Sequence, residues 1–137
     1  MKNQSITIGK HKFGPGLPVL VIAEIGTNHN GSFERAIEMI DLCVKMGADC
    51  AKFQMRNMAA VYRKNSLKRT GDDLSTEYTL DLLEKFELSI EQHQKLSEYC
   101  RSKGILYMCT PWDEKSIQVL EKIGVEAYKV ASADLTN

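Results

Sequence analysis

The 137-residue sequence has no excess charge of either sign, because eighteen Lys and Arg side chains balance eighteen Asp and Glu side chains. Nucleic-acid-binding domains and polybasic membrane modules carry a basic excess, so the totals favour neither class. No apolar run approaches the roughly 20 residues of a membrane span, and the first ten residues lack the apolar stretch of a signal peptide. These absences indicate a cytoplasmic globular domain.

The sequence also lacks the motifs of several common sites. Its four cysteines are too scattered for a CxxC metal or redox motif. Neither GxGxxG nor GxxxxGK[ST] occurs, which argues against a dinucleotide or P-loop site. No GxSxG elbow is present, which argues against a hydrolase nucleophile.

What is present is an alternation of strand and helix patterns. Apolar runs of strand length occupy residues 19–26, 49–55, 105–110 and 127–132. Amphipathic helix patterns that end in glycine occupy residues 32–47, 89–104 and 113–124. Right-handed crossovers between such strands predict a parallel sheet with the helices outside it.

Two further features refine this α/β fold class. The start of the chain, 1–18, alternates around Gly9 and predicts a small β-hairpin, so that 19–137 forms the main unit. "MGADCAKF" and "IGVEAYKV" repeat a glycine, an acid and a lysine at matched positions. Repeated βα units favour the first half of a (β/α)8 barrel, with a doubly wound, flavodoxin-like sheet as the alternative.

One segment, 56–88, interrupts this rhythm. It follows the C-terminal end of a strand, where parallel α/β folds place their sites, and a short helix is predicted near 77–86. Its basic run, Tyr62 to Lys64 with Lys68 and Arg69, is interpreted as a solvated loop face.

Polar residues gather where each predicted strand ends. The candidates are Glu24, Asn28, Lys52, Gln54, Thr110, Lys129, Ser132 and Asp134. Burying a lysine is costly unless it meets an anion, so two lysines at equivalent places in sister units predict a pocket for a multiply charged anion. Glu24 is expected to balance one of them or to transfer a proton.

Simpler interpretations stay open for single residues. A lone strand lysine can lie at an edge or extend to solvent. Ser132 can be a strand-end cap and Thr110 a loop start. The "TNHNG" sequence can be turn chemistry, or Asn28 or His29 can contact a ligand.

Three blocks carry a family resemblance. "IAEIGTNHNGS" (22–32), "GADCAKFQ" (47–54) and "YKVASADLTN" (128–137) together resemble the N-acetylneuraminate (sialic acid) synthase family, which includes synthases of other nonulosonic acids. The resemblance implies a (β/α)8 barrel that condenses phosphoenolpyruvate with an N-acetylated hexosamine such as N-acetylmannosamine. C3 of the enol attacks the open-chain aldehyde, water adds at C2, and phosphate leaves.

The resemblance also implies roles for residues. Lys52, Lys129 and Ser132 would hold phosphoenolpyruvate, and Gln54 and Thr110 would line the sugar side. Glu24 would lie close to the reacting carbons. Asp134 falls where many members carry glutamate, and Asn28 lies in the first block.

The remaining implications concern parts beyond this sequence. A divalent metal, Mn²⁺ or Mg²⁺, would be held by ligands outside this chain, and the full-length family is homodimeric. The chain corresponds to the first four βα units, without the second half of the barrel or the family's antifreeze-like domain. We therefore expect the isolated 137 residues to be catalytically silent and to self-associate. A 3-deoxy sugar acid synthase and a non-catalytic anion-binding half-barrel are the alternatives.

Overall fold

The computed structural model describes residues 5–61 and 74–136. In chain order its elements are β1 (Ile6–Ile8), β2 (His11–Phe13), β3 (Ile22–Gly26), α1 (Phe33–Lys45), β4 (Cys50–Met55), α2 (Met58–Val61), α3 (Leu74–Lys85), α4 (Ile90–Lys103), β5 (Leu106–Pro111), α5 (Glu114–Ile123) and the 3₁₀-helix η2 (Ser132–Asp134). The helix predicted near 77–86 is therefore present as α3. The basic run that begins at Tyr62 lies outside the described residues.

The three main strands are parallel and lie in the order β3-β4-β5. On the other side of β5, Tyr128 forms a single parallel bridge with Cys109. The four chain segments are thus side by side in sequence order, as in consecutive units of a barrel and unlike a doubly wound sheet, whose order switches. The predicted fold class, parallel β/α units after an N-terminal hairpin, is confirmed.

Two predicted strands differ from the observed ones. The fourth, predicted over 127–132, is wrong as a regular strand, since only the Tyr128 bridge forms and its end turns into η2. The first begins at Ile22 rather than Val19, which is 81% exposed. Strand formation depends on pairing with a neighbouring strand, and hydrophobicity along the sequence alone overestimates both lengths.

The helices begin and end where side-chain chemistry predicts. The Ser32 hydroxyl accepts a hydrogen bond from the Arg35 amide at 3.1 Å and caps α1. Ser89 and Gln92 form a capping box at the start of α4, and Gly104, the predicted end, closes that helix with φ of 74°. These local signals fix where the chain reverses between strands.

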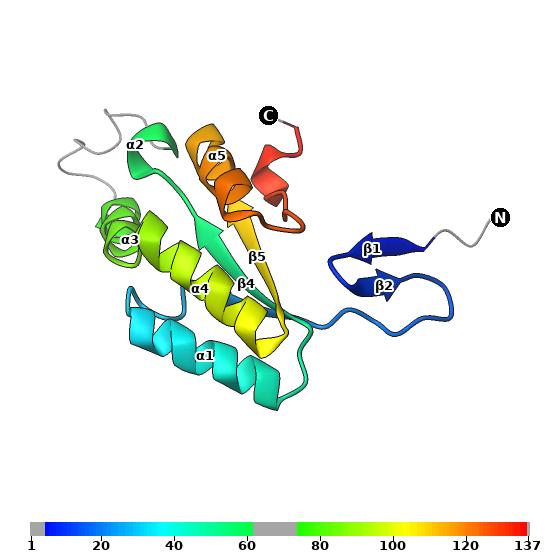
Figure 1. The fold of residues 1–137 in the computed structure, drawn as a ribbon. Coiled ribbons are helices and arrows are strands. Elements are labelled where there is room, and N and C mark those ends of the chain that lie inside the picture. Colours follow the sequence, from blue (N-terminus) through cyan, green and yellow to red (C-terminus); the bar gives the residue numbers. More distant parts are fainter. Residues whose placement is uncertain (1–4, 62–73, 137) are drawn as a thin grey trace.

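The sheet has two unlike faces. Helices α1, α4 and α5 cover one face (Figure 1), and the main apolar core lies between these helices and the strands, around Phe53 and Leu96. On the other face a smaller cluster of Cys50, Leu106 and Met108 packs against Ile8, Leu20 and Ala127. None of the helices in the described ranges is long and apolar enough to cross a membrane.

The predicted hairpin is confirmed as β1 and β2. They pair antiparallel around the turn that contains Gly9, with Ile8 opposite His11. The hairpin projects to one side of the helix-covered sheet (Figure 1) and contacts the smaller apolar cluster through Ile8.

Candidate functional site

Alternation along the strands places the predicted polar residues on one face of the sheet. Glu24 on β3 is in register with Lys52 on β4, and Gln54 is in register with Thr110 on β5. Their neighbour Phe53 points to the opposite, helix-covered face and is fully buried. The face opposite the helices therefore carries the candidate site toward the C-terminal ends of the strands.

Lys52 is buried and paired. It is only 6% exposed, and its ammonium forms an ion pair with the carboxylate of Glu24. The Glu24 side chain is 55% exposed, so this carboxylate remains open to solvent while it compensates the buried charge. The predicted balance between an acid and a strand lysine is thus present, and it explains how an apolar strand accommodates Lys52.

A bulge at the end of β3 shapes the site. The register of β3 and β4 shifts between Glu24 and Gly26, and Gly26 has a φ of 54°. A Cβ at this position would lie 3.3 Å from Nε2 of Gln54 and 3.6 Å from Oε1 of Glu24. Glycine is favoured here by the left-handed backbone conformation, and an added Cβ would also crowd the side-chain amide of Gln54.

Lys129 lies at the C-terminal edge of the sheet. Its neighbour Tyr128 bridges Cys109 and packs against the helix-side core. The Lys129 amide donates to the Cys109 carbonyl at 3.4 Å, which places the residue level with Thr110. Thr110 is buried, whereas Lys129 is exposed.

The remaining predicted residues lie just beyond the strand ends. Asn28 is exposed in the turn after β3, where its amide donates to the Ile25 carbonyl at 2.9 Å. Ser132 is exposed at the start of η2, and Asp134 is half-buried at its end. All three are at the same edge as the lysines, but in the described part of the chain no side-chain hydrogen bond joins them to Lys52 or Lys129.

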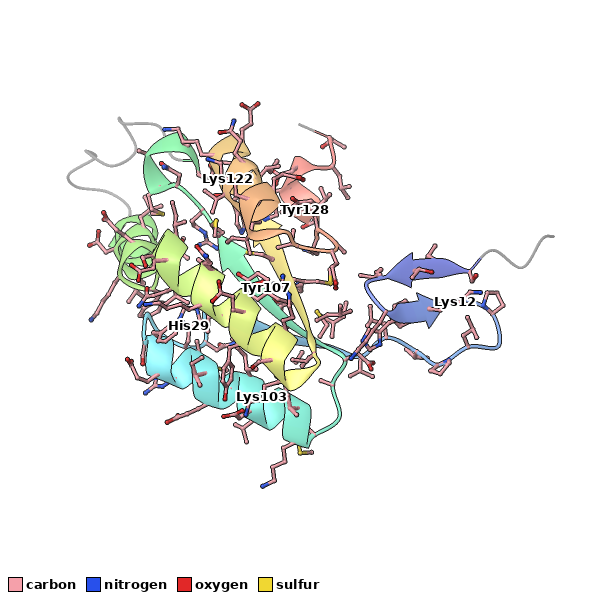
Figure 2. All side chains as sticks on the ribbon, viewed as in Figure 1. Lys12, His29, Lys103, Tyr107, Lys122 and Tyr128 are labelled. Atoms are coloured by element: carbon pink, nitrogen blue, oxygen red, sulfur yellow. The ribbon has the colours of Figure 1, made fainter. Side chains whose placement is uncertain are left out.

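His29, the neighbour of the exposed Asn28, is buried. The His29 ring is 2% exposed, its Nδ1 accepts from the Gly31 amide at 3.1 Å, and its centroid lies 6.1 Å from that of Phe53. Burial lowers the pKa of His29. Figure 2 shows this side chain near the N-terminal end of α1. Its contacts are those of a structural anchor for the turn.

His93 is the second buried histidine. Its Nδ1 lies 2.7 Å from the hydroxyl of Tyr107, and burial, with a smaller effect of His29, lowers its pKa to about 4. The ring meets Phe53 edge-on at a centroid distance of 6.4 Å. His93 belongs to the packing between α4 and the sheet.

The sequence interpretation missed a buried arginine cluster. Arg56, directly after β4, is 9% exposed and donates to the side-chain oxygen of Gln54. Its Nε lies 3.4 Å from Oε1 of Glu87, and its guanidinium carbon lies 5.2 Å from the ring centroid of Trp112. Desolvation raises the pKa of Glu87 to about 7 against the opposing effect of Arg56. The signal available in the sequence was Arg56 following Gln54 by two residues, and thus on the same face.

No metal centre is formed by this part of the protein. Across 5–61 and 74–136, no group of three or more His, Cys, Asp or Glu side chains is arranged to hold an ion. The described residues therefore do not fit the divalent metal that the family resemblance implies. The expectation that its ligands lie elsewhere stays a prediction.

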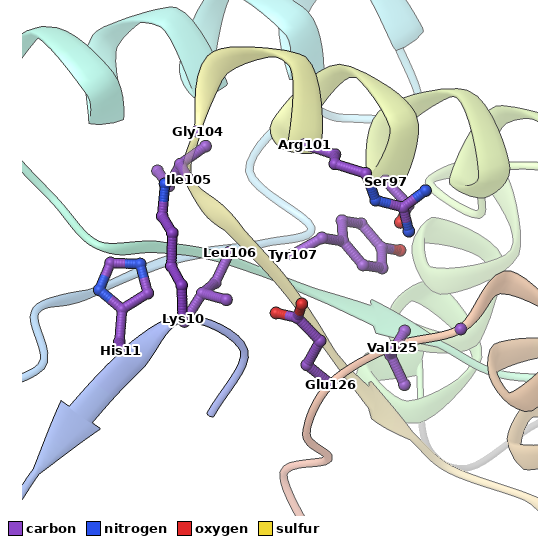
Figure 3. A pocket seen from close by; sticks show the side chains of 11 residues that line it. Lys10, His11, Ser97, Arg101, Gly104, Ile105, Leu106, Tyr107, Val125 and Glu126 are labelled. Carbon is purple, nitrogen blue, oxygen red and sulfur yellow. The ribbon is translucent and has the colours of Figure 1, made fainter. Parts of the chain in front are cut away.

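A cavity of about 160 Å³ lies away from this site. It is lined from the hairpin by Lys10, from α4 by Arg101, and from the start of β5 by Leu106 (Figure 3). Glu126 closes it from the segment after α5. These residues mark the N-terminal ends of the strands, opposite to the end that carries Gln54 and Thr110.

Comparisons with known proteins match this geometry to one family. Residues 39–137 match the NeuB family. The chain is 36% identical over 129 residues to N,N'-diacetyllegionaminic acid synthase of Legionella pneumophila, covering 90% of this chain and 36% of that protein. It is 32% identical over 122 residues to human N-acetylneuraminate-9-phosphate synthase, covering 88% of this chain and 34% of that protein.

A solved structure agrees with the sequence comparisons. The N-acetylneuraminic acid (sialic acid) synthetase of Leptospira borgpetersenii, in complex with citrate, superposes with a TM-score of 0.81 at 34% identity, covering 98% of this chain and 44% of that one. The chain thus spans about a third of the length of the curated relatives named above. From the family match and the shared fold together, the chain belongs to the NeuB family.

Proposed function

We propose that this chain supplies the anion-binding part of a nonulosonic acid synthase. The observation that carries the proposal is the register-matched pair of Glu24 and Lys52, with Gln54 and Thr110 beside it on one face. Family membership supplies the reaction, and the relatives named above are synthases of legionaminic acid and N-acetylneuraminate 9-phosphate. The substrates are phosphoenolpyruvate and an N-acetylated hexosamine, N-acetylmannosamine or a relative.

The two lysines bind phosphoenolpyruvate. The half-exposed carboxylate of Glu24 holds the ammonium of Lys52 in one position. Little side-chain entropy is therefore lost when the substrate binds. Lys129 is exposed at the C-terminal edge of the sheet, next to the bridge of Tyr128 to β5, and supplies the second ammonium group. Two ammonium groups suit a ligand with both a phosphate and a carboxylate, because negative charge develops on the bridging phosphate oxygen as its bond to C2 breaks.

The other residues complete the site at its rim. Ser132 donates to phosphoenolpyruvate, while Gln54 and Thr110 line the side where the sugar binds. Asp134, at the end of η2, and Asn28, in the turn after β3, contact the sugar or an ordered water.

The reaction joins C3 of phosphoenolpyruvate to the aldehyde carbon of the hexosamine. Water adds at C2, and the C–O bond to phosphate breaks, which releases inorganic phosphate. Glu24 is solvent-accessible and forms an ion pair with Lys52. From this position it exchanges a proton with the substrate or orients a reacting group. The working enzyme is a cytoplasmic homodimer that uses Mn²⁺ or Mg²⁺.

The test measures product formation in the full protein that the gene encodes. Phosphoenolpyruvate is supplied with N-acetylmannosamine and related N-acetylated hexosamines, and with phosphorylated unacetylated aldoses, in Mn²⁺. Formation of a nonulosonic acid together with phosphate supports the proposal. Reaction only with the unacetylated aldose indicates a 3-deoxy sugar acid synthase, and binding of phosphoenolpyruvate without turnover indicates a non-catalytic anion-binding protein.

A matched pair of variants tests whether the ammonium of Lys52 has a specific role at the anion site. Lys52→Met removes the ammonium of the site, and Lys95→Met removes one from an exposed ion pair with Glu91 on α4, where Nζ and Oε1 are 2.7 Å apart. The first is expected to abolish turnover and the second to leave it unchanged. Equal effects of the two substitutions would contradict a specific role for Lys52.

A further inference from the structure

Arg56 makes three contacts at the C-terminal edge of β4. Its side chain is 5% exposed, and it donates to the side-chain oxygen of Gln54. On other sides it meets the carboxylate of Glu87, 3.4 Å from Nε, and the ring of Trp112, 5.2 Å from the guanidinium carbon. A guanidinium that is held by a carboxylate and an aromatic face has little freedom to turn, so its third partner is fixed as well.

These contacts determine which way the Gln54 amide points. A guanidinium carries only donors, so the atom of Gln54 that faces Arg56 is the amide oxygen. The amide nitrogen then lies on the other side, 3.3 Å from the point where a Cβ on Gly26 would stand. Oε1 of Glu24 is 3.6 Å from the same point. The NH₂ group of Gln54 therefore lies on the side of Gly26, which the carboxylate of Glu24 also approaches.

We propose that Arg56 is a positioning residue that holds Gln54 as a hydrogen-bond donor toward the hexosamine. The group recognised by Gln54 is consequently an acceptor oxygen of the sugar, either a hydroxyl or the carbonyl of the acetamido group. This inference rests on the proposed function, because that function places Gln54 on the sugar side. It adds a direction to the contact and a residue that enforces it.

Arginine is the side chain that this arrangement requires. Lysine has a single charged nitrogen and cannot reach the Gln54 oxygen, the Glu87 carboxylate and the Trp112 ring face at the same time. Glu87 lies just after α3, so the contact also ties the two ends of the segment between β4 and α4 to each other. Residues outside the substrate site, Glu87 and Trp112, thus fix Arg56 and through it the orientation of the Gln54 amide.

The test compares Arg56→Met and Arg56→Lys with wild type in the full encoded protein, with Lys95→Met as the control for loss of an exposed cation. Arg56→Met frees the Gln54 amide to rotate, and KM for the N-acetylated hexosamine is expected to rise about tenfold. KM for phosphoenolpyruvate should stay within about twofold, because Lys52 and Lys129 are untouched. Arg56→Lys should also raise KM for the hexosamine, to a value close to that of Arg56→Met. Gln54→Glu, which keeps an acceptor toward Arg56 and removes the donor, should raise the sugar KM by a similar factor.

Three results separate the inference from the function on which it rests. Equal changes in both KM values, or none, in Arg56→Met would overturn the positioning role. A wild-type KM for the sugar in Arg56→Lys would show that the planar guanidinium with its several donors is not required. Absence of any product from wild type would remove the proposed function and with it the sugar assignment.

The orientation itself is then decided by ¹⁵N-glutamine NMR, with the Gln54 signal assigned through Gln54→Glu. Gln54 NH₂ protons that exchange with water faster in Arg56→Met than in wild type, with no such change in Lys95→Met, support the fixed amide. Identical signals in wild type and Arg56→Met contradict it.

Discussion

The two faces of the same strands do different work. On β4, Phe53 faces the helices and is fully buried among apolar side chains, whereas Lys52 and Gln54 face the other way and meet Glu24 and Arg56. The period of two along a strand separates these roles at adjacent positions. The helix face carries the main apolar core, and the other face, which has only a smaller apolar cluster, also holds charges that a core would exclude.

This division predicts unequal effects of neighbouring substitutions. Helix-face changes should lower stability without altering substrate preference, and site-face changes should do the reverse. Substitutions on the helix-covered face and on the site face therefore test how strictly stability and substrate binding are separated.

The largest expected effect is on the isolated 137 residues. Val19 is 81% exposed, Val130 is 59% exposed, and both lie beside the described sheet. Apolar surface of this kind favours association. We expect residues 1–137 alone to form no product from phosphoenolpyruvate and N-acetylmannosamine and to elute from a sizing column as an oligomer. A catalytically active monomer would contradict this.

The next largest effect concerns Phe53. Phe53→Ala removes a fully buried ring that packs against His29, His93 and Tyr107, and it should lower the free energy of unfolding by about 3–5 kcal/mol. Gln54→Ala, one residue away on the half-buried site face, is expected to cost about 1 kcal/mol. Denaturant titration of both variants checks the difference, and similar losses would refute the separation of the faces.

A smaller effect is expected for Lys129→Ala. Because Lys129 is exposed, its loss should leave stability within about 0.5 kcal/mol of wild type. The Kd of phosphoenolpyruvate should rise about tenfold to a hundredfold, since hydrogen bonds to charged groups contribute about 1.5–3 kcal/mol. An equal loss of affinity for the sugar would assign this lysine to the scaffold.

The smallest effect is a pair of opposing pH dependences. Glu87 has a pKa of about 7 in the fold, raised by burial, so its protonated form favours the native state, and its contribution is lost as pH rises from about 4.5 to 7. His93 has a pKa lowered to about 4, so its contribution is lost as pH falls from about 6.5 to 4.

Substituting either Glu87 or His93 should reveal the pH dependence of stability that the other residue causes. In Glu87→Gln, stability should fall more steeply on acidification than in wild type, and in His93→Gln it should fall more steeply as pH rises through the same window. Unfolding titrations at pH 4.5, 5.5, 6.5 and 7.5 measure both slopes. Parallel profiles for wild type and both variants would contradict these assignments.

The chain order of elements could be predicted from local chemistry. Ser32, Ser89 and Asp113 cap the three main helices, and Gly104 and Gly124 end two of them in left-handed conformations, as their sequence positions indicate. Such signals depend on a few adjacent residues and act in almost any tertiary setting. For the same reason the pairing of Lys52 with Glu24 could be anticipated, because alternation along parallel strands fixes the face.

The rest depends on contacts between distant segments. Whether 127–132 becomes a strand is decided by what it pairs with, and only Tyr128 bridges β5. The Arg56 cluster joins residues from three segments, and Glu87 and Trp112 carry no local mark of it. Sequence spacing could place Gln54 on the site face but could not show which atom of its amide faces Arg56.

The central claim is that Lys52 and Lys129 act together on one anion, and calorimetric titration of phosphoenolpyruvate into the full encoded protein tests it most directly. Wild type, Lys52→Met, Lys129→Met, the double variant and the control Lys95→Met are compared in one buffer of fixed ionic strength. We predict that each single site substitution weakens binding about tenfold or more, that the double variant shows no measurable heat, and that Lys95→Met binds as wild type does. Unchanged affinity in the double variant would contradict the account.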